Sequence, residues 1–253
     1  MRAAARWCRP RAEASESAVP APPKKPQGPR GPIDPAQVGK ITGIVRFDGE
    51  APQRKELSIG GTGGCPEHAT PVFEESAIVR DGRLANVFVY IKDGLDGWDV
   101  PPVGQGPRSM EQKGCLYVPR VLGMRVGETL SVSNLDEKTT HNVNIRSRNN
   151  ESLNPIQPPG GQPIEWKPGK REIAASFECN LHPWMKAWAC VVEHPWFAVS
   201  GEDGSFEIAG VPPGDYVVEA WHEKFGKKTL NLSLTPGGAA EATFAYKPTD
   251  KGR

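Results

Sequence analysis

The sequence predicts an all-β protein. The chain of 253 residues contains 28 glycines and 26 prolines, which indicates many turns between short extended segments. No stretch of helical length repeats its apolar residues at helical spacing, whereas runs such as residues 86–92 (NVFVYIK) have strand character. The pair Asp81-Gly82 between two apolar segments is a two-residue hairpin signal. Together these observations favour β-sandwich or β-barrel units.

The same pattern divides the chain into three parts. Residues 1–38 are rich in proline, alanine, arginine and lysine and lack core-forming residues, so they are predicted to form a disordered tail. Residues 39–196 are predicted to form one large β domain, and residues 197–248 a smaller β module. The strands and hairpins expected in these parts cover residues 41–47, 76–84, 86–92, 115–126, 128–134, 141–145, 173–179, 186–193, 201–224 and 229–238.

Composition and charge exclude several classes of partner. The formal net charge is +1 with 24% charged residues, which leaves no basic field for nucleic acid. No apolar run approaches the roughly 18 residues that a membrane-spanning helix needs. Arg2 and Arg6 are not followed by the apolar segment of a signal peptide, and Arg6 and Trp7 do not suit a lipid anchor on Cys8. A signal or anchor upstream of Met1 stays open at this point.

The most informative segment for chemistry is a Cys-x-x-His-x-x-Met loop from Cys179 to Met185, with His141 earlier in the chain. Cys179 is expected to end a strand, His182 and Met185 to lie in the tight loop after it, and His141 to come from a separate strand. A thiolate and two imidazoles with a weak axial thioether select copper and tune it for electron transfer. The three nitrogen and sulfur ligand atoms should lie within about 4 Å of a common centre, because such metal bonds are about 2.0–2.3 Å long.

These residues resemble the cupredoxin family, the plastocyanin- and azurin-like blue copper proteins. The resemblance covers GETLSVSNLDEKTTHNV and FECNLHPWM, and more loosely the strands from Lys40 to Glu193. It implies a Greek-key sandwich with one type 1-like copper, in which His141, Cys179 and His182 are the equatorial ligands and Met185 is the axial one. The gap from His182 to Met185 is shorter than in plastocyanin-like loops. This departure bears on the assignment of Met185 as the axial ligand.

The resemblance also gives roles to two neighbours of the ligands. Asn142, which follows the first histidine, would connect the two ligand loops through hydrogen bonds. Trp184, between the last two ligands, should lie near the copper. It would either shield the site from water or belong to a docking or electron-exit surface.

Other metal centres fit the sequence less well. Zinc prefers closed tetrahedral sites without a thioether. Enzymatic copper clusters need further histidines, commonly in His-x-His pairs, but the remaining ones, His68, His194 and His222, are far apart. A binuclear purple centre would need a second cysteine a few residues from Cys179, and Cys190 lies too far along the next strand. The pattern therefore indicates one copper ion and no enzymatic activity.

The other cysteines and histidines have ordinary structural interpretations. Cys65 and Cys115 could form a disulfide, which would suit an oxidising compartment, although sequence alone does not give connectivity. His68 is expected to be a loop histidine, because Cys65-Pro-Glu-His68 lacks the second cysteine of a haem attachment motif. His194 and His222 are expected to pack beside tryptophans at the junction of the two units, a weak second metal site being the alternative.

The end of the chain has a resemblance of its own. The segment DGSFEIAGVPPGDYVVEAWHEK resembles the carboxypeptidase regulatory-like, prealbumin-type β modules, and GKITGIVRFDGEAP near residue 40 is faintly similar to the same unit. The likeness implies a structural or interaction module without catalytic residues. Chains that combine such a module with a cupredoxin resemble periplasmic or secreted bacterial proteins.

The expected function is single-electron transfer between redox protein partners through a copper ion. Two alternatives remain from the sequence. One is copper carriage or storage, and the other is a metal-free β-sandwich that binds a glycan or a protein.

Overall fold

The computed structural model describes residues 31–61 and 63–252, and every regular element in these ranges is a β-strand. The all-β prediction is therefore confirmed. Within these ranges no helix is long and apolar enough to cross a membrane. The strands are β1 (Gly39–Phe47), β2 (Val79–Arg80), β3 (Arg83–Leu84), β4 (Phe88–Asp93), β5 (Arg108–Gln112), β6 (Tyr117–Val118), β7 (Val121–Arg125), β8 (Leu130–Asn134), β9 (His141–Asn142), β10 (Asn144–Arg146), β11 (Ile156–Gln157), β12 (Ile164–Trp166), β13 (Glu172–Glu178), β14 (Lys186–Val192), β15 (Phe197–Val199), β16 (Ser205–Val211), β17 (Gly214–His222), β18 (Gly226–Leu234) and β19 (Ala239–Tyr246).

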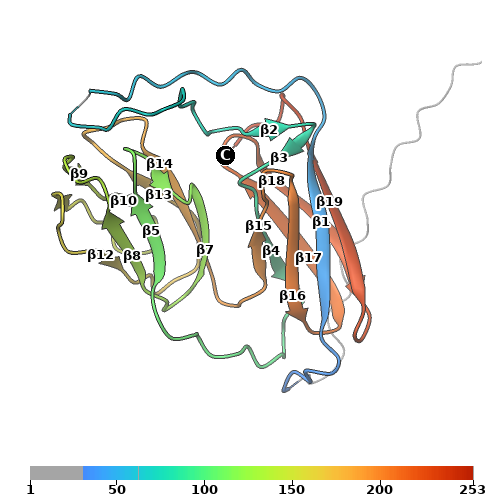
Figure 1. The fold of residues 1–253 in the computed structure, drawn as a ribbon. Coiled ribbons are helices and arrows are strands. Elements are labelled where there is room, and N and C mark those ends of the chain that lie inside the picture. Colours follow the sequence, from blue (N-terminus) through green and yellow to red (C-terminus); the bar gives the residue numbers. More distant parts are fainter. Residues whose placement is uncertain (1–30, 62, 253) are drawn as a thin grey trace, which may run out of the picture.

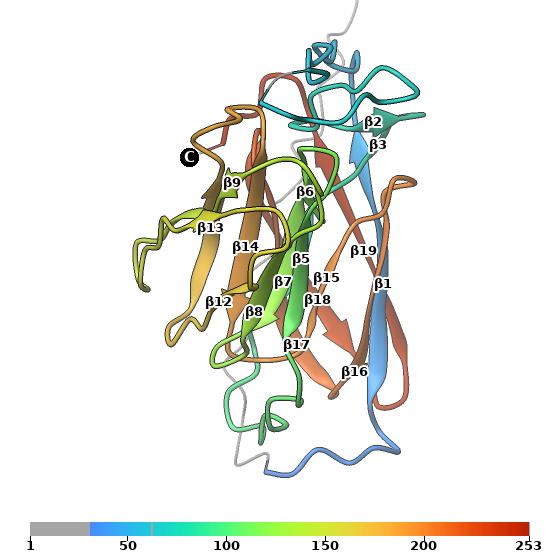
Figure 2. The ribbon, with the colours of Figure 1, turned by 60° about the vertical axis from the view of Figure 1, so that its left-hand side comes forward.

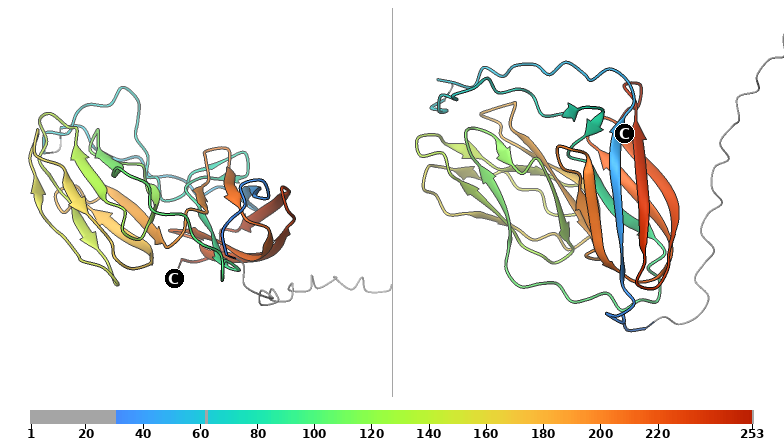
Figure 3. Two further views of the ribbon diagram at one scale, coloured as in Figure 1. Left: turned by 90° about the horizontal axis from the view of Figure 1, so that it is seen from below. Right: turned by 45° about the vertical axis from the view of Figure 1, so that its right-hand side comes forward.

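The strands form two β units that lie side by side (Figure 1), and the view from below shows them as separate stacks (Figure 3, left). We call residues 108–192 the central unit. It consists of two four-stranded sheets, in the orders β10-β13-β14-β7 and β12-β8-β5-β6. The short strand β9, at one end of the unit (Figure 2), pairs with β11. β7 pairs with β14 in parallel, as β5 does with β8, so the chain must cross between the sheets instead of turning back in hairpins.

The core of the central unit explains why its strands have alternating apolar residues. Side chains from both sheets fill it, among them Met110, Val132, Ile145, Phe177 and Val191. Facing sheets of a sandwich bury one side of each strand in this way. The central unit is thus a β-sandwich, as the sequence predicted.

The second unit is built from both ends of the described chain, and we call it the composite unit. β1 lies between β16, with which it pairs antiparallel, and β19, with which it pairs in parallel, and β3 and β2 extend that sheet. The other sheet has the order β15-β4-β17-β18. Residues of both chain segments share its core, for example Val45, Val89, Val218 and Phe244.

This pairing corrects the predicted domain boundaries. The strands β1 and β4 do not belong to the same domain as the metal-binding motif, because they pair with strands of the composite unit. The module predicted for residues 197–248 is accordingly not complete by itself. Its strands need partners located more than a hundred residues earlier, which the sequence pattern does not indicate.

The predicted tail also needs a correction at its end. Gly31 forms a bridge with Trp98, with its amide 2.8 Å from the carbonyl oxygen of Gly97, and Ile33 packs against the core of the composite unit. Residues 31–38 are therefore part of the folded structure. The rest of the predicted tail, residues 1–30 with Cys8, lies outside the described residues.

The predicted Asp81-Gly82 hairpin is confirmed. It joins β2 and β3, which pair antiparallel, and both turn residues have positive φ, 48° at Asp81 and 68° at Gly82. Two successive positive φ values are what a tight hairpin turn of this type requires, and Asp-Gly provides them at low cost.

Buried polar and aromatic contacts hold the two units together. Arg120 of the central unit donates two hydrogen bonds to Glu223 of the composite unit, from Nε to Oε1 at 2.6 Å and from Nη2 to Oε2 at 2.8 Å. Both side chains are less than a tenth exposed. Trp188 and Trp221 meet edge to face nearby, with ring centroids 5.6 Å apart. The two hydrogen bonds between the Arg120 guanidinium and the Glu223 carboxylate fix the orientation of one unit against the other.

Candidate metal centre

The Cys-x-x-His-x-x-Met loop joins β13 to β14 at one end of the central unit. Cys179 directly follows β13, and Met185 directly precedes β14. Two backbone hydrogen bonds close the loop, from the Cys179 amide to the Met185 carbonyl at 3.3 Å and from the Met185 amide to the His182 carbonyl at 2.9 Å. His141 opens β9, next to this loop. The ligand residues therefore come from the elements that the sequence analysis assigned.

Three of the four predicted ligands face one another. His141 Nδ1 lies 3.0 Å from His182 Nδ1, and the Sγ of Cys179 lies 3.8 Å from the former nitrogen and 3.5 Å from the latter. The point equidistant from the corners of this triangle is about 2.0 Å from each atom, close to the 2.0–2.3 Å of metal bonds to imidazole and thiolate. A metal ion therefore fits among these atoms without any rearrangement of the backbone.

The three ligands are enclosed by protein. His141 is 0% exposed, and Cys179 and His182 are each 2% exposed. Buried polar groups of this kind need partners, and these three groups have each other. A cluster of two imidazoles and a thiol in the protein interior is the arrangement of a soft-metal site.

Burial and hydrogen bonding change the protonation of the ligands. Burial opposes the thiolate of Cys179, but hydrogen bonds from His141 and from backbone amides outweigh it and lower the pKa of the thiol. Burial likewise opposes the imidazolium of His141, but hydrogen bonds with Asp136 and Cys179 raise its pKa. Burial and the neighbouring charge of His141 lower the pKa of His182. These shifts favour the charged forms of Cys179 and His141 and the neutral form of His182.

Asp136 is the residue of this centre that sequence reasoning missed. Its Oδ2 lies 2.9 Å from His141 Nε2 and accepts the amide hydrogen of Cys115 at 2.9 Å, while Oδ1 accepts that of Gly114 at 2.6 Å. The carboxylate therefore holds a proton on Nε2, so that Nδ1 presents its lone pair to the centre. Its position five residues before His141 was the available signal.

Asn142 connects the two ligand segments. Its Oδ1 accepts a hydrogen bond from the Cys179 thiol at 3.4 Å and another from the Asn180 amide at 2.6 Å. Its Nδ2 donates to Oδ1 of Asn154 at 2.6 Å. The side chain thus orients the sulfur and the start of the ligand loop, which is the role that the sequence analysis expected of it.

Trp184 and Met185 lie beside the three ligands. The Trp184 ring centroid is 5.4 Å from that of His182, and its Nε1 donates to the Cys115 carbonyl at 3.0 Å. Met185 is fully buried and belongs to the same core cluster as Cys179. Both residues are near the centre, and the assignment of Met185 as the axial ligand stays a prediction.

A disulfide joins Cys65 to Cys115 beside the centre, with Cα atoms 5.8 Å apart. This is the pair that the sequence analysis put forward, and the separation lies within the roughly 4.4–6.8 Å typical of disulfides. The segment between β1 and β2, which carries Cys65, leaves the composite unit and extends to the end of the central unit before returning (Figure 1). Thr139 Oγ1 also donates to the Gly64 carbonyl at 2.6 Å. The segment is thus fixed against the metal centre.

The remaining histidines have protein partners of their own. His68 Nε2 donates to the Gly114 carbonyl at 2.9 Å. His194 Nε2 donates to the Ile91 carbonyl at 2.8 Å, and His222 Nδ1 accepts the amide hydrogens of Lys224 and Phe225. Among the described residues, the groups of potential metal ligands all lie at the Cys179 end of the central unit.

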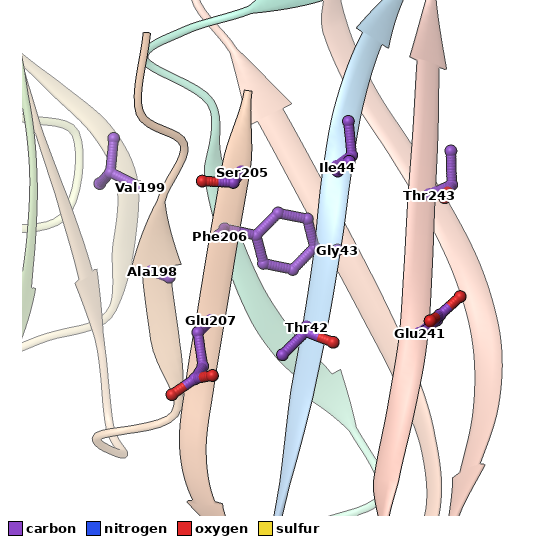
Figure 4. Close-up of a pocket in the computed structure, with 10 residues that line it drawn as sticks. All are labelled: Thr42, Gly43, Ile44, Ala198, Val199, Ser205, Phe206, Glu207, Glu241 and Thr243. Atoms are coloured by element: carbon purple, nitrogen blue, oxygen red, sulfur yellow. The ribbon is translucent and has the colours of Figure 1, made fainter. Parts of the chain in front are cut away.

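A groove on the outer face of the composite unit has no such chemistry. It has a volume of about 690 Å³ and lies over β1, β16 and β19 (Figure 4). The ring of Phe206 lies over Gly43, where a side chain would collide with it. Its two carboxylates come from Glu207, which is paired with Lys40, and Glu241. The residues that line the groove include no histidine or cysteine.

Comparisons with known proteins find no matching family model and no matching curated protein. Among solved structures, a copper-containing nitrite reductase (NirK) from Thermus scotoductus SA-01 has 24% identity and a TM-score of 0.32, and covers 38% of this chain. The chain spans about a quarter of that protein, since 25% of the reductase is covered.

Two smaller proteins are similar over nearly their whole length. A purple cupredoxin from Nitrosopumilus maritimus has 21% identity and a TM-score of 0.28, with 33% of this chain and 98% of that protein covered. A variant of amicyanin in its Cu(I) form has 17% identity and a TM-score of 0.31, with 41% of this chain and 97% of that protein covered. Since these similarities are low and partial, the assignment of the metal rests on the geometry of the site itself.

Proposed function

We propose that this protein is an electron carrier that holds one copper ion between His141, Cys179 and His182. The observation that carries the proposal is the buried triangle of two Nδ1 atoms and one Sγ, with sides of 3.0, 3.5 and 3.8 Å. One thiolate with two imidazoles is the donor set of blue-copper electron-transfer sites. Met185 is the thioether proposed for the weak axial position.

Copper supplies a one-electron couple between Cu(I) and Cu(II) when it is bound, and the protein supplies a fixed set of donors. Asp136 orients His141, and Asn142 orients Cys179. The backbone bonds between Cys179 and Met185 keep the loop closed. Because the ligands are fixed in this way, one geometry can serve both oxidation states, and electron transfer then needs little reorganisation.

Burial of the ligands favours electron transfer over copper carriage. The two histidines and the cysteine are at most 2% exposed, so an exchanging metal ion would have to pass through covering protein. An electron can cross a covering layer without any such opening. Copper carriage or storage remains the alternative, and a metal-free binding module is the third.

Several further properties belong to the same proposal. The protein would act on redox protein partners and would have no enzymatic activity of its own, which is supported by the protein contacts of His68, His194 and His222. The disulfide between Cys65 and Cys115 supports a periplasmic or secreted location, where disulfides persist. The composite unit would be a structural or interaction module of the carboxypeptidase regulatory-like kind, completed by β1 and β4.

Reconstitution with Cu(II) followed by metal analysis, a visible spectrum and voltammetry tests the proposal. We expect one copper per chain, an intense visible band from thiolate-to-copper charge transfer, and a reversible one-electron wave. Copper binding without the band and the wave would favour carriage. A chain that binds neither copper nor another metal would favour the metal-free binding module.

A further inference from the structure

A second group of soft ligands lies on the other side of His182. The sulfur atoms of Cys65 and Cys115 and a ring nitrogen of His182 lie within 4.8 Å of one another, and all three residues are buried. His182 directs Nδ1 toward His141. Its Nε2 faces Gly63, where a Cβ would lie 3.0 Å from that nitrogen. One imidazole thus stands between the proposed copper ligands and the disulfide.

A cavity adjoins this second group at Cys65. It has a volume of about 520 Å³ and is lined by residues 64–66 on one side and residues 135–139 on the other. Cys65 therefore forms part of its wall, as do the carboxylate-bearing residues Asp136 and Glu137. The wall of this cavity thus combines residues with acidic side chains and one of the two cysteines of the second group.

We propose that Cys65 and Cys115, once their disulfide is reduced, form with His182 a second metal site that binds Cu(I). Two thiolates and an imidazole are ligands that select Cu(I) and other soft ions. In the oxidised protein the sulfur atoms are bonded to each other, so the disulfide keeps this site closed. The inference goes beyond the proposed electron transfer. The second site shares His182 with the proposed copper site but needs neither His141 nor Cys179.

The distances allow such a site without movement of the backbone. Two metal–sulfur bonds of about 2.3 Å place their sulfur atoms at most about 4.6 Å apart. The Cα atoms of Cys65 and Cys115 are 5.8 Å apart, so rotation about the side-chain bonds is enough to provide this spacing. The amide of Cys115 is held by Asp136, which keeps that residue in place when the disulfide is absent.

Opening the site requires two electrons, which an external dithiol supplies by thiol–disulfide exchange. A thiolate of the reagent attacks one sulfur to form a mixed disulfide, and its second thiol then resolves it. The protein gains two thiols, and the reagent becomes a disulfide. When Cu(I) binds, the two thiols release their protons to solvent.

The test uses a chain whose first site is disabled, His141→Ala/Cys179→Ser, which keeps His182. The full-length variant is treated with a phosphine, which takes oxygen from water and becomes the phosphine oxide as the disulfide is reduced. Cu(I) is then titrated in competition with a chromogenic chelator, and a thiol assay verifies the reduction. We expect one tightly bound Cu(I) in the reduced variant that is missing from the oxidised one.

The matched control adds Cys65→Ser and Cys115→Ser to the same variant and retains the other cysteines, Cys8 and Cys190. The proposal is overturned if the reduced variant binds no more Cu(I) than this control or than its own oxidised form. If the variants do not fold, as judged by circular dichroism, the same titration is carried out on the wild type. The proposal then requires that the reduced wild type bind one more Cu(I) per chain than the oxidised wild type, and equal binding overturns it. The Cu(II) spectrum of the oxidised wild type tests the proposed electron-transfer site separately.

Discussion

The metal centre and the junction between the two units each contain one free cysteine and two histidines, all buried. In the centre these are Cys179, His141 and His182, and near the junction they are Cys190, His194 and His222. The two regions therefore contain the same kinds of potential metal ligands, and in both regions these side chains are buried. The difference lies in what the side chains face.

Near the junction each group is satisfied by the protein backbone or packed among apolar side chains. Burial lowers the pKa of His194 to about 4 and that of His222 to about 3, and it raises the pKa of Cys190 to about 12. In the centre, by contrast, hydrogen bonds lower the pKa of Cys179 despite its burial. A buried histidine or cysteine is therefore a candidate ligand only when its lone pairs face other donors, and burial alone makes it a neutral core residue.

The largest expected effect comes from exchanging sulfur for oxygen in both regions. Cys179→Ser should abolish the visible band of the Cu(II) protein, because the thiolate is the chromophore, even if some copper still binds through the histidines. Cys190→Ser should keep the band and cost about 1–3 kcal/mol of unfolding free energy, as a hydroxyl is placed in an apolar environment. Visible spectra and denaturant unfolding of both variants measure these effects. Equal loss of colour in both would remove the distinction between the regions.

Replacing the carboxylate behind His141 should weaken metal binding. We expect Asp136→Asn to lower the affinity for Cu(II) about 10–100-fold, as is typical when the partner of a ligating histidine is changed. The lost negative charge should also raise the reduction potential. Glu172→Gln is the matched control, because it neutralises a buried carboxylate of the same unit that binds residues 147–150 instead of a ligand. Competition titrations that give equal affinities for the two variants would contradict the role of Asp136.

The residues of the proposed site stand out in the sequence because Cys179, His182 and Met185 lie on one short loop, whose spacing is fixed by local geometry. Asp136 was missed, since its position five residues before His141 did not distinguish it among the 30 acidic residues and its amide partners Gly114 and Cys115 come from a distant loop. The division into units was missed for the same reason. The pairing of β1 with β16 and β19 joins segments far apart in sequence, and alternation of apolar residues identifies a strand without identifying its neighbour.

A histidine near the junction should make the protein acid-sensitive in a defined range. Burial lowers the pKa of His222 to about 3 in the folded chain. At any pH below the ordinary pKa near 6.5, the imidazole therefore binds a proton when the chain unfolds. Its contribution to stability is therefore complete above about pH 6.5 and is lost as the pH falls toward 3. Between pH 7 and 5 the loss should be about 2 kcal/mol.

The variant His222→Asn isolates this contribution, because the asparagine oxygen can accept the amide hydrogens of Lys224 and Phe225 without titrating. Denaturant unfolding of the metal-free wild type and variant at pH 7 and pH 5 gives the two losses. The variant should lose about 2 kcal/mol less than the wild type over this interval. Equal losses would mean that His222 is not the neutral buried group that the comparison requires.

The smallest expected effect concerns the proposed axial ligand. Met185→Leu conserves volume, so the band should persist, while the reduction potential should rise by tens of millivolts, on the order expected when a weak axial thioether is lost. Met124→Leu is the control, because Met124 is fully buried in the same core. Its potential should be unchanged. If both variants keep the wild-type potential, another group occupies the axial position.

The most direct test of the account is X-ray absorption spectroscopy of the copper-loaded wild type in both oxidation states. We predict two nitrogen neighbours at about 2.0 Å and one sulfur neighbour at no more than about 2.3 Å from the metal. Both distances should change little between Cu(II) and Cu(I), because the protein fixes the ligands. A copper ion with nitrogen and oxygen neighbours only, and no short sulfur distance, would contradict the proposed site of His141, Cys179 and His182.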